Sequence, residues 1–169
     1  MEEDKVGIID YGAGNLKSVY NMLKHLNIAS VISSNPKELE RCTKLILPGV
    51  GKFDWAINEL HRNGLYQTIK EQSSLKKPIL GICLGAQLLL EGSEEGDKPG
   101  LGVIPGLSRK FQGSSSIRVP HMGWNTIDEY KPKFDLFGDK DERRFYFAHS
   151  YYMDVDEKFS LAKTNYGSR

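Results

Sequence analysis

The segment from Pro78 to Leu90 constrains the fold of this chain more than any other. It reads Pro-Ile-Leu-Gly-Ile-Cys-Leu-Gly-Ala-Gln-Leu-Leu-Leu, so one apolar run passes into another across a Gly-X-Cys-X-Gly corner centred on Cys83. Glycines on both sides remove the side chains that would collide where a strand turns directly into a helix. Helix-terminal amides near the sulfur favour the thiolate, which is the reactive form of cysteine. The pattern predicts that Cys83 is an exposed nucleophile; the alternative is an ordinary buried cysteine on a core strand.

Strand-like and helix-like patterns alternate before this corner. Short apolar runs at residues 6–9, 29–33 and 44–47 indicate buried strands, and a helical pattern follows each of them. This alternation predicts the α/β class, with a three-layer, mostly parallel, doubly wound sheet that carries helices on both faces.

Beyond Glu91 the pattern changes to short β-like runs separated by polar turns. We expect strands at residues 101–104, 107–111, 117–119, 145–148 and 159–162. No repeat and no long linker interrupts these runs. We therefore interpret residues 1–169 as a single domain with a β-rich C-terminal part.

Composition excludes several classes of function. The chain has 23 basic and 22 acidic residues and a net charge of +1, so we expect no nucleic-acid partner. No apolar segment approaches the roughly 20 residues that span a bilayer, and the acidic N-terminus is unlike a signal peptide. We therefore expect a cytoplasmic protein without a membrane partner. Two cysteines cannot form a disulfide scaffold, and the four histidines show no paired spacing, so we expect no metal site and no cofactor.

Two glycine-rich loops follow predicted strands. In the first, Gly12-Ala13-Gly14, the third glycine of a dinucleotide-binding fingerprint is replaced by Lys17, so we reject that function. We interpret the loop as a tight connection in which Asn15 either caps the next helix or reaches a ligand or partner. The second loop, Pro48-Gly49-Val50-Gly51, contains two glycines that allow the backbone to approach a bound group. It is the second candidate for a functional site.

Six motifs together resemble those of the class I (triad) glutamine amidotransferases, and within them the glutaminase subunits of imidazole glycerol phosphate synthase. The resemblance extends from about Val6 to the last residue. The Gly-X-Cys-X-Gly-X-Gln motif is shared by the whole class, while the runs at 10–15 and 120–125 are typical of this subunit type. The motifs are Ile9-Asp-Tyr-Gly-Ala-Gly-Asn15, Leu47-Pro-Gly-Val-Gly51, Gly81-Ile-Cys-Leu-Gly-Ala-Gln87, Gly100-Leu-Gly-Val-Ile-Pro-Gly106, Pro120-His-Met-Gly-Trp-Asn125 and Phe147-Ala-His-Ser-Tyr151.

The resemblance implies a thioester mechanism. Cys83 would attack the side-chain amide of glutamine and release ammonia, and water would then free glutamate. The oxyanion that develops needs preorganised N–H donors, for which the candidates are Leu84, which follows the nucleophile, and Val50 or Gly51 in the second loop.

The resemblance also implies a set of residues that hold the glutamine substrate. Gln87 lies one helical turn beyond Cys83 and can face the same pocket. A solvated helix residue is the alternative for Gln87, and a plain strand end is the alternative for the segment from His149 to Tyr152. The implied glutamine-binding residues are Gly51, Gln87, Ser150 and Tyr151.

A catalytic cysteine of this kind needs a histidine base, and the family supplies it from a His-Pro-Glu run. His121 is followed by Met122-Gly123 and His149 by Ser150-Tyr151, so neither has the His-X-Glu pattern. In the family this run lies nearer the C-terminus than Arg169 does here. We therefore expect that the 169 residues lack a C-terminal strand and helix, and that as given they do not turn over glutamine at a useful rate.

The implied partner is a cyclase subunit with a (β/α)8 barrel, which would form a heterodimer with this chain and use its ammonia in histidine biosynthesis. Alternatives are a paralogous subunit for sugar amidation in surface-polysaccharide synthesis, a non-catalytic binding subunit, and an unrelated cysteine hydrolase. A core tryptophan beside a turn glycine is the alternative to an interface role for the run at 120–125. The predicted interface residues are Asn15, His121, Met122, Trp124 and Asn125.

Overall fold

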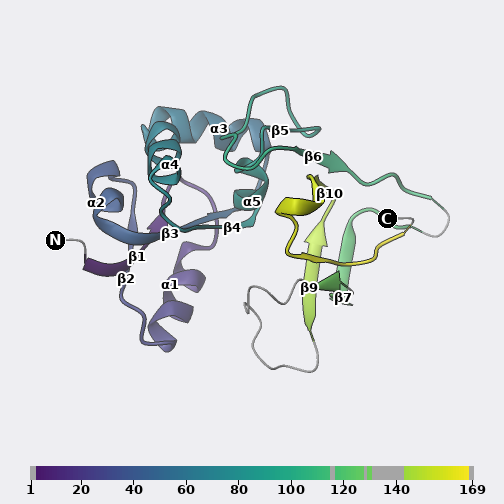
Figure 1. The fold of residues 1–169 in the computed structure, drawn as a ribbon, viewed down its shortest axis with the longest axis horizontal. Coiled ribbons are helices and arrows are strands. Elements are labelled where there is room, and N and C mark those ends of the chain that lie inside the picture. Colours follow the sequence, from purple (N-terminus) through teal and green to yellow (C-terminus); the bar gives the residue numbers. More distant parts are fainter. Residues whose placement is uncertain (1–2, 115–116, 128, 131–142, 168–169) are drawn as a thin grey trace.

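The N-terminal half of the chain is built on a parallel sheet. A computed structural model of the protein describes residues 3–114, 117–127, 129–130 and 143–167 (Figure 1). Four strands pair in the order β2-β1-β3-β4, and every pairing within this sheet is parallel, as the sequence predicts. The strands are β1 (Glu3–Ile9), β2 (Ser30–Ser33), β3 (Cys42–Gly49) and β4 (Ile79–Cys83).

Helices connect these strands and cover the sheet. In Figure 1, α1 lies on the opposite side of the strands from α3 and α4, which confirms the expected layers. Asparagine side chains cap the first two helices, with Asn15 accepting from Ser18 N and Asn35 from Lys37 N. Within the described residues, no helix is long and apolar enough to cross a membrane. The helices are α1 (Leu16–His25), α2 (Pro36–Arg41), α3 (Phe53–Arg62), α4 (Leu65–Ser74) and α5 (Leu84–Leu88).

The main hydrophobic core lies on one face of the sheet. Leu45 and Leu47 of β3 are buried against apolar residues of α2, α3, α4 and α5. No residue of α1 is buried, and its Tyr20 side chain and that of Leu26 just beyond it are exposed. Burial of each core side chain contributes about 1.5–3 kcal/mol, so this face holds the C-terminal ends of β3 and β4 rigidly side by side.

The C-terminal half is rich in short strands and lies beyond β5 and β6 in Figure 1. Its main sheet has the order β10-β6-β5, and two further pairs, β7 with β9 and β8 with β11, are antiparallel. The elements are β5 (Gly92–Ser93), β6 (Leu107–Lys110), β7 (His121–Thr126), β8 (Glu129–Tyr130), β9 (Arg144–His149), β10 (Tyr151–Asp154), the 3-10 helix η1 (Glu157–Phe159) and β11 (Ala162–Lys163).

Three of the predicted short strands are wrong. Residues 101–104 cap α5 instead, because Leu101 N and Val103 N donate to the carbonyls of Leu88 and Leu89, each at 2.9 Å. Residues 117–119 are irregular, and residues 159–162 contain the end of η1 and the start of β11. The strands predicted at 107–111 and 145–148 correspond to β6 and β9, whereas β7 and β10 were not predicted.

Candidate active site

The strand-to-helix corner around Cys83 is present and strained. Cys83 ends β4 with φ 55° and ψ −118°, a conformation that is costly for a residue with a side chain, and α5 begins at the next residue. A Cβ at Gly81 would lie 2.5 Å from the Ala86 Cα, and one at Gly85 would lie 1.7 Å from the Leu47 carbonyl oxygen. Both flanking glycines are therefore required by close backbone contacts. The corner leaves the Cys83 side chain exposed to solvent.

The second glycine loop lies beside this corner. Gly49 is paired with Cys83 in the β3–β4 register, so Val50 and Gly51 continue from the same edge of the sheet. Val50 is 58% exposed, and Gly51 has φ +105° with no atom within 4 Å of the position its Cβ would take. Leu84 is buried and is the first residue of α5. Its backbone N–H therefore has no carbonyl acceptor within that helix. The three residues proposed as oxyanion donors therefore follow directly from the paired ends of β3 and β4.

Tyr11 is a buried polar residue at this corner that sequence reasoning missed. Its side chain is fully buried, and a Cβ at Gly49 would lie 2.5 Å from its hydroxyl oxygen. Within the described residues this hydroxyl has no hydrogen-bond partner. Burial, and to a smaller extent the negative charge of Cys83, raise the pKa of Tyr11 above its usual value. Nothing in the sequence around Tyr11 predicts that its hydroxyl is buried beside Gly49.

Gln87 points toward a buried serine. Its Oε1 accepts a hydrogen bond from the Ser108 hydroxyl at 3.2 Å, and Ser108 lies fully buried in β6. The alternative of a solvated helix residue is therefore wrong. This bond orients the amide, and the N–H groups of Gln87 can donate to another molecule. Ser108 was not predicted, since only the pairing of β6 with its neighbours brings it near α5.

Ser150 and Tyr151 lie where β9 turns into β10. The Ser150 carbonyl accepts from Phe111 N at 3.0 Å, and Tyr151 is opposite Lys110 of β6. The pKa of Tyr151 is raised by burial and then by the negative charges of Glu95 and Glu94. The Tyr151 hydroxyl is therefore electrostatically coupled to two carboxylates that the sequence presents only as part of a polar loop.

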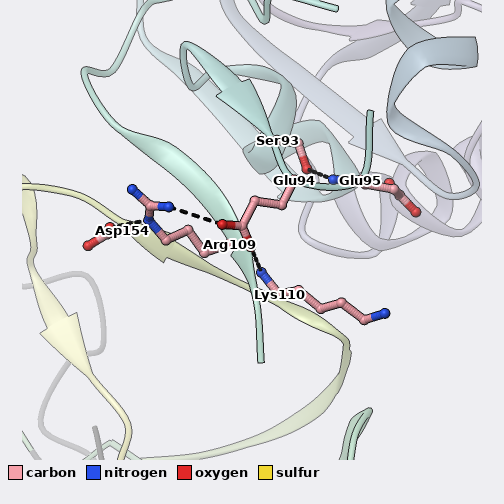
Figure 2. Close-up of polar contacts among 6 residues, drawn as sticks. All are labelled: Ser93, Glu94, Glu95, Arg109, Lys110 and Asp154. Carbon is pink, nitrogen blue, oxygen red and sulfur yellow. Dashed lines mark hydrogen bonds and ion pairs between the residues drawn. The ribbon is translucent and has the colours of Figure 1, made fainter. Parts of the chain in front are cut away.

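These two carboxylates are held in different ways (Figure 2). Glu94 accepts from Lys110 N at 2.8 Å and from Arg109 Nη1 at 3.0 Å, and Arg109 also pairs with Asp154. The backbone hydrogen bond from Lys110 and then the one from Arg109 lower the pKa of Glu94. Glu95 instead accepts from Phe53 N at 3.0 Å, at the start of α3. The Glu94 charge is thus compensated by a cation, whereas Glu95 has a neutral donor.

The two histidines of the C-terminal half face each other. His121 of β7 is 4% exposed, and its Nδ1 lies 3.1 Å from Nε2 of His149, its register partner in β9. The other nitrogen of His149 lies 2.8 Å from the Tyr151 carbonyl oxygen. Neither ring is bonded to a carboxylate in the described part of the chain, so the pair has no resemblance to the His–Glu part of a triad.

The predicted interface residues divide into two groups. Met122 and Trp124 are 61% and 66% exposed, so the alternative of a core tryptophan is wrong. His121 and Asn125 point inward, where Asn125 Nδ2 lies 3.4 Å from His121 Nε2. Asn15 is exposed and caps α1. Contact with a partner stays a prediction for all five, and the large hydrophobic side chains that β7 exposes for it are Met122 and Trp124.

Metal binding has no support in the described residues. Among them, no group of three or more His, Cys, Asp or Glu side chains is arranged to hold a metal ion.

Comparison with known proteins identifies the family. The model of the family described as glutamine amidotransferase class-I matches residues 7–168. The imidazole glycerol phosphate synthase subunit HisH of Leptospira interrogans is 42% identical over 167 residues, which cover 96% of this chain and 82% of the relative. The corresponding HisH 2 of Pseudomonas aeruginosa is 44% identical over 164 residues, with 96% and 81% covered.

Solved structures with the same fold are more distant in sequence. A crystal structure of a glutamine amidotransferase matches with a TM-score of 0.69 at 18% identity, covering 94% of this chain and 79% of the other. The structure of PurLQS from Thermotoga maritima matches with a TM-score of 0.62 at 18% identity, covering 99% of this chain and 76% of the other.

With a matching family model over nearly the whole chain and relatives above 40% identity, this chain belongs to the class I glutamine amidotransferases.

Proposed function

We propose that this chain is the glutaminase subunit of an imidazole glycerol phosphate synthase, which hydrolyses glutamine and delivers ammonia to a cyclase subunit. The relatives named above are subunits of that enzyme and match almost the whole chain. The observation that carries the proposal is the strained, exposed Cys83 at a strand-to-helix corner, with a glycine loop at its side.

The reaction proceeds in two steps at the Cys83 sulfur. The thiolate attacks the side-chain amide carbon of glutamine, and the carbonyl oxygen becomes an oxyanion that accepts from N–H groups of Leu84 and of Val50 or Gly51. The C–N bond then breaks, the nitrogen takes up a proton and leaves as ammonia, and a thioester remains. Water adds to the thioester and loses a proton, and glutamate departs as the sulfur regains its negative charge.

Binding of glutamine is assigned to residues around Gln87. The Gln87 N–H groups can donate to the substrate, and the hydrogen bond from Ser108 to Oε1 orients the amide for this. Glu95 is the better partner for the substrate's α-ammonium group, since Arg109 already neutralises Glu94. Tyr151 interacts electrostatically with these carboxylates. Gly51 and Ser150 are the remaining residues proposed to bind glutamine.

The base is proposed to come from a His-X-Glu segment outside residues 1–169. Both ring nitrogens of His121 and of His149 already have hydrogen-bond partners, and none of these partners is Cys83. A histidine whose lone pair faces another imidazole is not available to take a proton from a thiol or a water. We propose that residues 1–169 form a single domain together with a further strand and helix, and that the base lies in that further part.

The partner is proposed to be a (β/α)8-barrel cyclase that contacts the outer face of β7 and β9. Trp124 packs edge-on against Tyr146 at 5.8 Å, and Arg144 lies over its ring at 5.9 Å. Exposed aromatic side chains of this kind are the usual anchors of protein interfaces. Ammonia is better used when producer and consumer dock and exclude water, and a cytoplasmic location suits a reactive thiol.

Glutamate release tests the proposal. The complete subunit, with saturating glutamine, cyclase ligand and the cyclase itself, should release glutamate, and Cys83→Ser should abolish this release. Cys42→Ser is the matched control, because Cys42 is buried away from the corner and should leave the rate unchanged. Undiminished release by Cys83→Ser contradicts the mechanism, and a productive complex with a sugar-amidating synthetase instead favours the paralogous function.

A further inference from the structure

A chain of hydrogen bonds leads through both histidines to the glutamine-binding turn. Asn125 Nδ2 lies 3.4 Å from His121 Nε2, His121 Nδ1 lies 3.1 Å from His149 Nε2, and His149 Nδ1 lies 2.8 Å from the Tyr151 carbonyl oxygen. The chain starts on β7, crosses to β9 at the position where the two histidines are register partners, and ends at the first residue of β10. It therefore connects three strands, the first of which is distant in the sequence from the other two.

Only one choice of tautomer for each histidine satisfies every hydrogen bond of this series. A carbonyl oxygen can only accept, so His149 Nδ1 carries a hydrogen and His149 Nε2 presents a lone pair when the ring is neutral. His121 Nδ1 must then be the donor to that lone pair. Its own Nε2 is left to accept from the Asn125 amide.

Asn125 is itself held in one orientation. Its Nδ2 donates a second hydrogen bond to the Asn165 carbonyl at 3.1 Å, and its Oδ1 accepts from Thr126 N at 2.8 Å. Turning the amide over would place an oxygen against the Asn165 carbonyl and against the His121 lone pair. The orientation of Asn125 therefore supports the same two histidine tautomers that the Tyr151 carbonyl requires.

The surroundings of His121 disfavour its charged form. The His121 ring is stacked between Tyr166 at 3.8 Å and Phe147 at 4.6 Å, and the Phe111 ring meets His149 edge-on at 5.3 Å. Burial and the neighbouring His149 lower the pKa of His121. Tyr166, whose hydroxyl donates to the Arg118 carbonyl, is the titratable side chain stacked on the pair from the last described segment.

We propose that His149, held in its tautomer by His121, is a positioning residue for the glutamine-binding turn Ser150–Tyr151. The proposal rests on the proposed function, because it concerns the residues assigned to glutamine. Two successive carbonyls of the turn are anchored, Ser150 by Phe111 N and Tyr151 by His149 Nδ1. These two bonds fix the backbone that carries the Tyr151 side chain, whose pKa is raised by burial and by the charges of Glu95 and Glu94. His149 touches neither the sulfur nor the substrate amide in this role.

Two substitutions separate the hydrogen bond from the ring. An asparagine amide N–H can occupy the place of Nδ1, whereas a glutamine amide reaches the place of Nε2. His149→Asn should therefore keep the bond to the Tyr151 carbonyl, and His149→Gln should lose it. Both variants lose the same ring packing against Phe111, so each is the control for the other.

The measurement is protection of Cys83 from iodoacetamide by glutamine, which reports binding without needing turnover. His149→Gln should raise the apparent Kd for glutamine about 3- to 10-fold, as expected for one lost hydrogen bond, and His149→Asn should stay within about twofold of the wild type. The alkylation rate without glutamine should be the same in all three proteins, since the corner at Cys83 is untouched. In the wild type the apparent Kd should rise as the pH falls below about 6.5, because a proton taken up by His121 Nε2 would face the N–H of the Asn125 amide.

The possible failures are distinguishable. Equal glutamine affinity in the wild type and both variants overturns the positioning role alone, and so does an equal loss in both variants, which would assign the effect to the ring. If glutamine gives the wild type no protection at any concentration, the glutamine site itself is misassigned and the proposed function fails together with this inference.

Discussion

Replacing Tyr11 by phenylalanine should stabilise the protein, although it removes a polar group from the candidate active site. The Tyr11 hydroxyl is fully buried and has no partner within the described residues. A buried donor without an acceptor costs about 1–3 kcal/mol relative to its hydrated state. Phenylalanine fills the same space without this penalty. We expect Tyr11→Phe to raise the free energy of unfolding by about 1 kcal/mol, or Tm by about 2–4 °C for a chain of this size.

Tyr66→Phe is the matched control with the opposite sign. The Tyr66 hydroxyl donates to the Gly100 carbonyl at 2.7 Å, and its ring stacks on His61 at 4.0 Å. The same chemical change here removes a satisfied hydrogen bond and leaves a carbonyl without its donor, so we expect a loss of about 0.5–1.5 kcal/mol.

Urea unfolding followed by circular dichroism measures both variants against the wild type. The reasoning depends on the sign of the difference between the two tyrosines rather than on the absolute values. Loss of stability in Tyr11→Phe comparable to that in Tyr66→Phe would refute it, because the Tyr11 hydroxyl would then have a partner worth as much as the Gly100 carbonyl.

Four further outcomes are expected. Iodoacetamide at neutral pH should label Cys83 faster than the buried Cys42, and peptide mapping that finds the reverse order rejects Cys83 as nucleophile. Trp124→Ala should weaken binding of the cyclase subunit by about 2 kcal/mol or more. Trp55 is an exposed tryptophan on α3, and Trp55→Ala should leave this binding unchanged. If calorimetric titration finds the same affinity for Trp124→Ala as for the wild type, Trp124 does not belong to the interface. The lowered pKa of His121 means that the unfolded state binds more protons, so its contribution to stability is present above about pH 6.5 and is lost as pH falls toward the folded pKa; urea midpoints that do not fall on acidification would contradict this. A polypeptide of residues 1–169 should release glutamate about 10²- to 10⁴-fold more slowly than one extended through the next His-X-Glu, and comparable rates would place the base within these residues.

Local patterns were sufficient to predict the α/β half and its corner. The parallel sheet follows from the alternation of buried strands with amphipathic helices, which leaves few other ways to cover both faces. The Gly-X-Cys-X-Gly corner follows from sterics within a few residues, and the clashes that a Cβ would make at Gly81 and Gly85 give the physical reason for both glycines. The short strands of the second half were predicted less well, because a run such as 101–104 has the composition of a strand but uses its amides to cap α5.

What the sequence alone determined is therefore the exposed cysteine corner, the glycine loop beside it and the sheet that holds them, since these depend on neighbours along the chain. Tertiary structure decided the environment of that site. Ser108 reaches Gln87, Arg109 neutralises Glu94, and His121 meets His149 only because β6, β7, β9 and β10 pair in particular registers. A strand shifted by one residue would turn each of these side chains to the opposite face, and no local pattern in the sequence states the register.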